Sequence, residues 1–146
     1  MHRFLEARVA DYMTARVVSV APETTLDALE DHFARYDFNG LPVLAGSALV
    51  GMVTKFDLLR AFIFTPQSVI PAYEELIKLT AHDIMTSDVI SFPAETPLTR
   101  VLQALVDVRV KSFPVIDNDR LVGIIAREDV VRALRDAREG RKSVKA

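Results

Sequence analysis

Two aspartates are the residues of this sequence with the clearest chemical use. Each closes a seven-residue stretch that opens with glycine: Gly51–Asp57 reads Gly-Met-Val-Thr-Lys-Phe-Asp, and Gly123–Asp129 reads Gly-Ile-Ile-Ala-Arg-Glu-Asp. A carboxylate offers two acceptor oxygens, and charge-assisted hydrogen bonds to it are about twice as strong as neutral ones. An aspartate at the rim of a cleft is therefore well suited to accept hydrogen bonds from the hydroxyl groups of a ligand.

The same spacing also predicts a structural use for the aspartates. Thr54 and Asp57 stand where the N-cap and N3 residues of a helix would be, and a capping pair of this kind stabilises a helix by about 1 kcal/mol. The second stretch has Ala126 in place of the threonine but keeps Asp129. Compensation of the helix dipole is another reason to keep an acid there, so both uses stay open for both aspartates.

Both stretches belong to an internal repeat. Residues 9–61 align with residues 81–133 at a constant offset of 72 and without a gap. The copies share Asp-x-Met-Thr at their start, Pro-Val in the middle and Leu-Val-Gly before the aspartate. A solenoid needs three or more units to bury its stacked faces, so two copies predict a closed domain with a pseudo-twofold axis.

Local patterns predict the same elements in both copies. A short strand rich in β-branched residues comes first, then a helix with Thr24 or Thr96 as its N-cap, then a hairpin, and finally a helix that begins near Lys55 or Arg127. The expected strands are residues 17–20, 41–44 and 48–53 in the first copy and 89–92, 113–116 and 121–125 in the second. The fold class is α/β of the α+β type, with the order βαββα repeated in tandem.

The repeat also sets the expected domain organisation. The predicted segments are a first repeat at 1–64, a linker at 65–80, a second repeat at 81–138 and a basic C-terminal tail at 139–146. The stretch 55–64 is apolar almost all round, whereas its counterpart in the second copy is amphipathic. Phe62, Ile63 and Phe64 are therefore expected either to pack on the linker or to form the seam of a homodimer.

Composition narrows the possible functions. The chain has no cysteine, which removes disulfides, thiolate nucleophiles and cysteine-bound zinc. The net charge of −2 is not that of a nucleic-acid-binding protein. Neither a signal peptide nor a membrane-spanning stretch is recognisable, so a cytoplasmic location without a membrane partner is expected. His2, His32 and His82 are scattered and suggest neither a metal site nor a catalytic triad, so no enzyme activity and no catalytic cofactor are predicted.

These motifs resemble the cystathionine β-synthase (CBS) domain, whose tandem pair is called a Bateman module. The resemblance lies in Met-Thr-x-x-Val near the start of each copy, in Leu-Pro-Val or Phe-Pro-Val at the third element, and in Gly-x-x-Thr-x-x-Asp before the last helix. It covers nearly the whole chain. It implies that the sheets of the two copies face each other and that clefts between the copies bind AMP, ADP, ATP or S-adenosylmethionine. It also implies a regulatory module that forms a homodimer and signals through a separate effector protein.

The resemblance further implies which residues bind the ligand, with each aspartate accepting the hydroxyls of a ribose. One cleft is implied to use Thr54, Asp57, Val89, Ile90, Lys111, Ser112, Phe113 and Pro114. The other is implied to use Thr14, Val17, Val18, Asn39, Gly40, Leu41, Pro42 and Asp129. Ala126 departs from the family pattern, so the second cleft is expected to be the weaker.

Alternatives to ligand binding remain for single residues and for the whole chain. Lys111 is the expected phosphate contact, because its counterpart Asn39 is neutral, but a solvated surface lysine fits as well. For the valines, plain core packing is the alternative to contact with adenine. For the chain as a whole, the alternative is an adaptor that keeps the fold and binds a protein partner without any small ligand.

Overall fold

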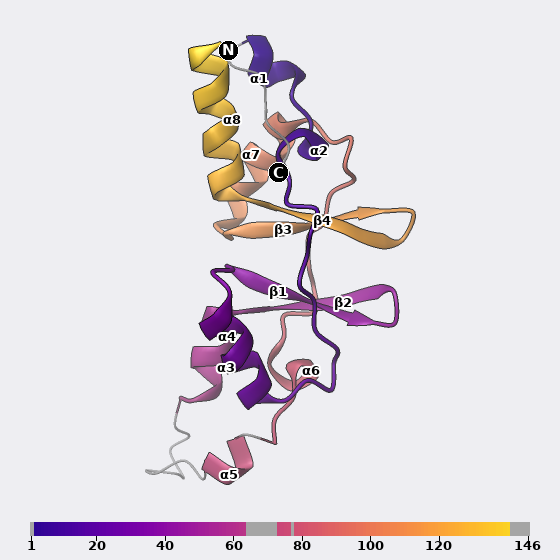
Figure 1. The fold of residues 1–146 in the computed structure, drawn as a ribbon, viewed down its shortest axis with the longest axis vertical. Helices are drawn as coiled ribbons and strands as arrows, with labels where there is room; N and C mark the ends of the chain where they lie inside the picture. Colours follow the sequence, from indigo (N-terminus) through magenta and orange to yellow (C-terminus); the bar gives the residue numbers. More distant parts are fainter. Residues whose placement is uncertain (1, 64–72, 77, 141–146) are drawn as a thin grey trace. The chain divides into compact units, whose positions relative to one another are not determined.

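The computed structural model describes residues 2–63, 73–76 and 78–140 (Figure 1). It is a mixed helix and strand protein with two small antiparallel sheets, as predicted, and the chain divides into two compact units. The central unit is Val18–Val89, and the terminal unit combines the residues up to Val17 with those from Ile90 onward. Phe64, residues 65–72 of the predicted linker and residues 141–146 of the predicted tail lie outside the described residues.

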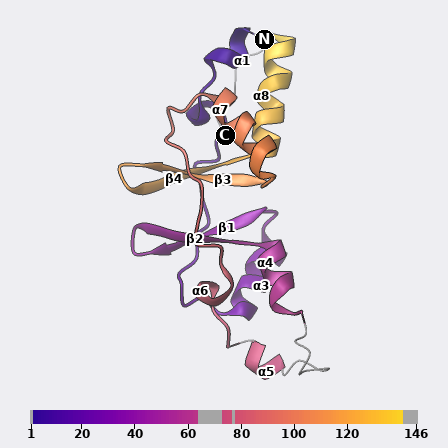
Figure 2. The same ribbon diagram turned by 180° about the vertical axis from the view of Figure 1, so that it is seen from behind.

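Each unit has one hairpin and several helices. The central unit contains α3 (Leu26–Arg35), β1 (Gly40–Ala45), β2 (Ala48–Thr54), α4 (Lys55–Ala61), α5 (Tyr73–Leu76) and α6 (Ala81–Ile84). The terminal unit contains α1 (His2–Glu6), α2 (Val9–Tyr12), α7 (Leu98–Val108), β3 (Ser112–Asp117), β4 (Arg120–Ala126) and α8 (Arg127–Glu139). Figure 2 shows from behind how α3 and α4 lie beside one hairpin and α7 and α8 beside the other.

The two hairpins agree with the prediction to within about one residue at each strand end. Their two-residue turns need backbone with positive φ, which Gly46 supplies at 65° and Asn118 and Asp119 supply at 50° and 61°. Within the sheets, Gly40 pairs with Thr54 and Ser112 pairs with Ala126. These pairs end the sheets, and each final helix begins at the next residue.

The predicted first strand of each copy is wrong. In place of the strand at 17–20 there is one parallel bridge, Val20 to Val43, and in place of the strand at 89–92 there is one bridge, Phe92 to Val115. Val20 donates its N–H to Pro42, and Phe92 donates its N–H to Pro114. A proline nitrogen has no hydrogen to donate, so the ladder cannot continue toward residues 18 and 90.

The helix that follows begins slightly later than predicted. The N-caps are Thr25 and Pro97 rather than Thr24 and Thr96. The Thr24 hydroxyl accepts a hydrogen bond from the N–H of Ala21 at 3.1 Å, so it stabilises the preceding turn and not the helix. Sequence position alone did not distinguish these two uses of a threonine.

Each compact unit contains the opening segment of the other sequence repeat. In the central unit, Met52 and Thr86 exchange two backbone hydrogen bonds of 2.9 Å, and in the terminal unit Thr14 and Ile124 do the same. The glycine beside each bridge is needed for this approach, since a Cβ at Gly51 or at Gly123 would lie 2.9 Å from the backbone carbonyl oxygen of Thr86 or of Thr14. The compact units therefore do not follow the repeat limits, and the predicted domain limits remain a prediction from sequence similarity.

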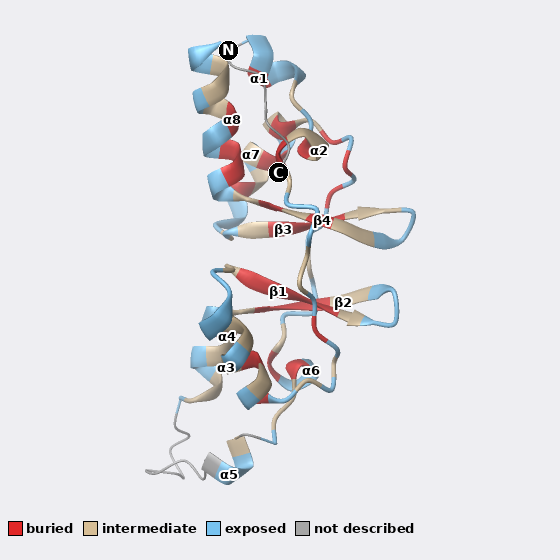
Figure 3. Cartoon of the chain, in the orientation of Figure 1, coloured by how far each residue is buried: buried red, intermediate tan, exposed pale blue. Residues whose placement is uncertain are grey.

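Each unit has its own hydrophobic core, visible as the buried residues in Figure 3. In the central unit Leu26 and Leu29 of α3 pack with Leu41, Val43 and Val53 of the sheet. The core of the terminal unit is formed in the same way by residues of α2, α7, β3, β4 and α8, among them Val9, Leu98, Val101, Phe113, Val115, Ile125 and Val130. The rigid sheet-to-helix junctions that carry the two aspartates rest on these cores.

Candidate functional site

Asp57 is held at the start of α4 by a reciprocal pair of contacts with Thr54. The N–H of Asp57 donates to the Thr54 hydroxyl at 3.1 Å, and the N–H of Thr54 donates to Asp57 Oδ2 at 2.9 Å. The Thr54 hydroxyl also lies 3.0 Å from the same oxygen and donates to it. The capping use predicted from the sequence is therefore confirmed for this pair.

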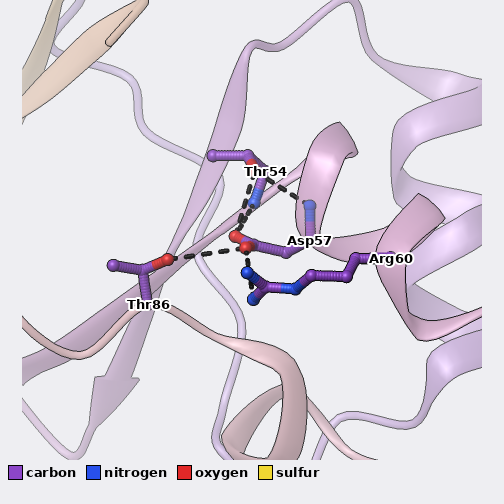
Figure 4. Close-up of polar contacts among 4 residues, drawn as sticks. All are labelled: Thr54, Asp57, Arg60 and Thr86. Carbon is purple, nitrogen blue, oxygen red and sulfur yellow. Dashed lines mark hydrogen bonds and ion pairs between the residues drawn. The ribbon is translucent and has the colours of Figure 1, made fainter. Parts of the chain in front are cut away.

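The other oxygen of Asp57 has two further donors. Arg60 Nη2 lies 3.2 Å from Oδ1, and the hydroxyl of Thr86 lies 3.4 Å from it (Figure 4). A carboxylate has about four acceptor positions, and the two contacts from Thr54 together with those from Arg60 and Thr86 occupy all of them. The side chain is only 3% exposed, so Asp57 is a buried acid surrounded by hydrogen-bond donors of its own unit.

Asp129 occupies the equivalent place at the start of α8 but has fewer donors. Its Oδ2 accepts the N–H of Ala126 at 2.8 Å, and its Oδ1 lies 3.3 Å from Arg132 Nη1. No cap hydroxyl is present, because residue 126 is alanine. Burial raises the pKa of Asp129 above the ordinary value, against the opposing effects of the Ala126 N–H and of Arg132.

The arginine one turn after each aspartate is held differently in the two units. Arg132 donates from Nη2 to the carbonyl oxygen of Tyr12 at 3.0 Å and lies 5.4 Å from the centre of the Tyr12 ring. Arg60 lies 5.7 Å from the centre of the Phe56 ring, and among the described residues its guanidinium makes its polar contact with Asp57. Arg132 is thus fixed by α2, whereas Arg60 depends on the carboxylate itself.

The structure distributes the predicted ligand-binding residues over both compact units. The central unit holds Val18, Asn39, Gly40, Leu41, Pro42, Thr54, Asp57 and Val89, and the terminal unit holds Thr14, Val17, Ile90, Lys111, Ser112, Phe113, Pro114 and Asp129. Among them, Thr54 and Asp57 are in direct contact. The ligand-binding role of the whole set stays a prediction.

Several of these residues have a structural use that limits how they can meet a ligand. The side chains of Leu41 and Phe113 are fully buried in the two cores, and Phe113 packs edge-on against Phe92. Any contact from these positions to a ligand would have to come from the backbone. Lys111 is exposed, and its carbonyl oxygen accepts the N–H of Arg127 at 3.0 Å, which joins the loop before β3 to the start of α8.

Arg60, Arg132 and Thr86 are not among the site residues predicted from the sequence. A signal was present, because Arg-Ala follows each aspartate three residues later and Met-Thr opens both copies. Residues three apart lie on one face of a helix, so the arginines could have been placed beside the carboxylates. The contact of Thr86 could not, since it depends on the opening segment packing in the central unit.

The described part of the chain holds neither a metal-binding cluster nor a membrane-spanning helix. Residues 2–63, 73–76 and 78–140 contain no group of three or more His, Cys, Asp or Glu residues placed to hold a metal ion. Over the same residues, no helix has the length and apolar character needed to cross a membrane.

Comparison with known proteins shows the family. A CBS domain is matched at residues 9–63 and again at 81–136, and the chain belongs to the CBS domain family. CBSX1 of Arabidopsis thaliana is 30% identical over an alignment of 148 positions that covers 86% of this chain and 63% of that protein. YhcV of Bacillus subtilis, also a CBS domain-containing protein, is 25% identical and covers 84% of this chain and 81% of its own length.

Solved structures support the same fold. The structure of CBSX2 in complex with AMP is 30% identical, has a TM-score of 0.77 and covers 90% of this chain and 98% of that one. Protein MJ1225 from Methanocaldococcus jannaschii has a TM-score of 0.81 at 25% identity and covers 88% of this chain and 48% of that one. This chain is thus similar in fold to proteins built from CBS domain pairs.

Some relatives are much longer than this chain. The matched region spans 13% of an A-adding tRNA nucleotidyltransferase from Geobacter sulfurreducens and 21% of an inosine-5'-monophosphate dehydrogenase from Thermoplasma acidophilum. The similarity concerns a module within those proteins, and the activities of the whole proteins do not pass to this chain with it.

Asp129 and Asp83, whose pKa values are shifted in opposite directions, predict opposite dependences of stability on pH. The pKa of Asp129 is raised by burial, so its ionisation opposes folding. This loss of stability appears as the pH rises above 3.8, the ordinary pKa of an aspartate. The pKa of Asp83 is lowered by the N–H and hydroxyl of Thr80, so its stabilising effect is lost as the pH falls through the lowered value. Urea unfolding of wild type, D129N and D83N from pH 3 to 7 measures both effects.

Relative to wild type, D129N is expected to gain stability as the pH rises through this range, because an uncharged amide still accepts the N–H of Ala126. D83N is expected to lose relative stability as the pH rises from below 3.8. Parallel pH profiles for the two variants would contradict the assignment of burial as the dominant cause at Asp129.

Proposed function

We propose that this chain is a regulatory module that binds an adenine nucleotide or a related adenosine compound, with Asp57 and Asp129 accepting the hydroxyls of the ribose. The observation that carries the proposal is that an acid is kept at the same sheet-to-helix junction of both units, although only one junction has a cap hydroxyl. The AMP complex of CBSX2, a structure 30% identical to this chain, supports the choice of ligand class.

The remaining predicted residues complete this proposal. One ligand would be bound by the Asp57 junction together with Val89, Ile90 and the loop at 111–114, and the other by the Asp129 junction together with Thr14, Val17, Val18 and the loop at 39–42. Lys111 is the proposed phosphate contact, since it is exposed and an isolated phosphate charge is costly to desolvate. The proposed setting is cytoplasmic, and the proposed output is a change in a separate effector protein rather than catalysis.

Nucleotide binding can be tested with a matched control. AMP, ADP, ATP and S-adenosylmethionine are titrated calorimetrically and by thermal shift. A ligand that binds only the native state raises the free energy of unfolding, by about 2.7 kcal/mol at a hundredfold excess over Kd, and so raises the melting temperature. D57N and D129N are each expected to weaken binding at least tenfold at one site. D83N is the control, because Asp83 also accepts the N–H and hydroxyl of a preceding threonine but lies exposed at the start of α6.

The adaptor alternative makes the opposite prediction. A chain that only binds a protein partner gives no thermal shift with any of these ligands at millimolar concentration, and D57N, D129N and D83N then differ only in stability. That result would remove the proposed function.

A homodimer is the second part of the proposal and rests on an exposed apolar stripe. Phe56, Leu59 and Ile63 lie on one side of α4 and its C-terminal end and are 68%, 69% and 71% exposed. Phe62, the first residue of the seam expected from the sequence, packs instead against the core of the central unit. We therefore propose that the stripe of Phe56, Leu59 and Ile63 pairs with a second copy of the chain.

The dimer can be tested by changing the stripe without touching the aspartates. The double variant F56S/L59S is expected to sediment as a monomer at concentrations where wild type sediments as a dimer, because its apolar contact area is lost. V106S is the control, since Val106 is a similarly exposed apolar residue, at 64%, on α7 of the terminal unit. A monomeric wild type, or a dimer that survives F56S/L59S, would contradict the proposed seam.

A further inference from the structure

The two proposed ribose acceptors differ in how many of their hydrogen-bonding positions are already used. Asp57 accepts from four donors: the N–H and hydroxyl of Thr54, the guanidinium of Arg60 and the hydroxyl of Thr86. Asp129 is contacted by two donors among the described residues, the N–H of Ala126 and the guanidinium of Arg132. Its side chain is also more exposed, at 10% against 3% for Asp57.

Not all the contacts of Asp57 can be exchanged equally. Oδ2 is bound by the backbone and hydroxyl of Thr54, which are fixed by the end of β2 and the start of α4. Oδ1 is bound by Thr86 at the long distance of 3.4 Å and by Arg60, whose side chain is 54% exposed. Thr86 is fixed by its two backbone hydrogen bonds to Met52, whereas Arg60 reaches Oδ1 only with the end of a long, half-exposed side chain. The guanidinium is therefore the group that can move away, and Oδ1 is the oxygen that becomes available.

We infer that Arg60 acts as an internal occupant of the hydroxyl-accepting position of Asp57, so that a ligand diol binds there only by displacing it. Asp129 needs no such exchange, because Oδ2 has one donor and because Arg132 is retained by the Tyr12 carbonyl and ring. The acid without a cap hydroxyl thus becomes the first site to fill, which reverses the order expected from the sequence. This inference rests on the proposed function.

Arg60 is a positioning residue in this account, and its removal is expected to strengthen binding. The test measures AMP binding calorimetrically in a D129N background, where only the Asp57 site remains. Adding R60Q is expected to tighten binding about two- to fivefold, as befits the loss of a half-exposed competing ion pair. R60K, which keeps the charge but loses the planar fork, is expected to lie between the two.

Two controls separate competition from other effects. R132Q in a D57N background is the matched change in the terminal unit and is expected to give no gain, because Arg132 does not have to leave. The gain from R60Q is expected with AMP and is expected to disappear with 2'-deoxyAMP, which lacks one of the two hydroxyls. Circular dichroism and melting temperatures confirm that each variant is folded.

The outcomes distinguish this inference from the proposed function. Weaker binding by R60Q would mean that Arg60 contacts the ligand. Unchanged binding would mean that Oδ1 does not exchange Arg60 for a ligand hydroxyl. Either result overturns the inference but leaves the proposed function in place if D57N and D129N still weaken binding. In wild type, the stronger of two binding phases should be lost in D129N, and its loss in D57N instead would also overturn it. Absence of nucleotide binding in wild type and in all variants would remove both proposals.

Discussion

The rest of the structure depends on one hydrogen bond at each junction. The residue that ends each hairpin donates its backbone N–H to the carboxylate at the third position of the next helix. It is 2.9 Å at Thr54 and Asp57 and 2.8 Å at Ala126 and Asp129. It fixes the direction in which the chain leaves the sheet, and it holds a charged acceptor in a buried place where only donors can surround it. A helix-start cap and an acceptor for ligand hydroxyls are thus two uses of one geometry.

The opening segments bring a second constraint to these junctions. Each hairpin has a glycine, Gly51 or Gly123, that lets the opening segment of the other repeat come close to the sheet. Thr86 then bonds to Met52, and Thr14 bonds to Ile124. In the central unit this places the Thr86 hydroxyl on Asp57. The two repeats therefore depend on each other for their local structure.

Much of the fold could be predicted from the sequence, because hairpin turns and helix starts are encoded locally. The turn at Asn118 and Asp119 and the helix starts at Lys55 and Arg127 follow from residue types within a few positions. The absence of the first strand in each copy could not be predicted, because it has a tertiary cause. Pro42 and Pro114, which lie opposite these segments, have no N–H to donate. Asp57 and Asp129 were identified correctly as junction residues. The difference in their hydrogen-bond donors depends in part on Arg60 and Arg132, which are equivalent in the repeat but are held differently in the two units.

Carboxyl-carbon NMR of aspartate side chains during titration with AMP tests the central claim most directly. The account predicts that the Cγ resonances of Asp57 and Asp129 move as the nucleotide saturates the protein, while that of Asp83, an exposed aspartate in a similar cap, stays in place. Saturation by AMP with no movement of either junction resonance would contradict it.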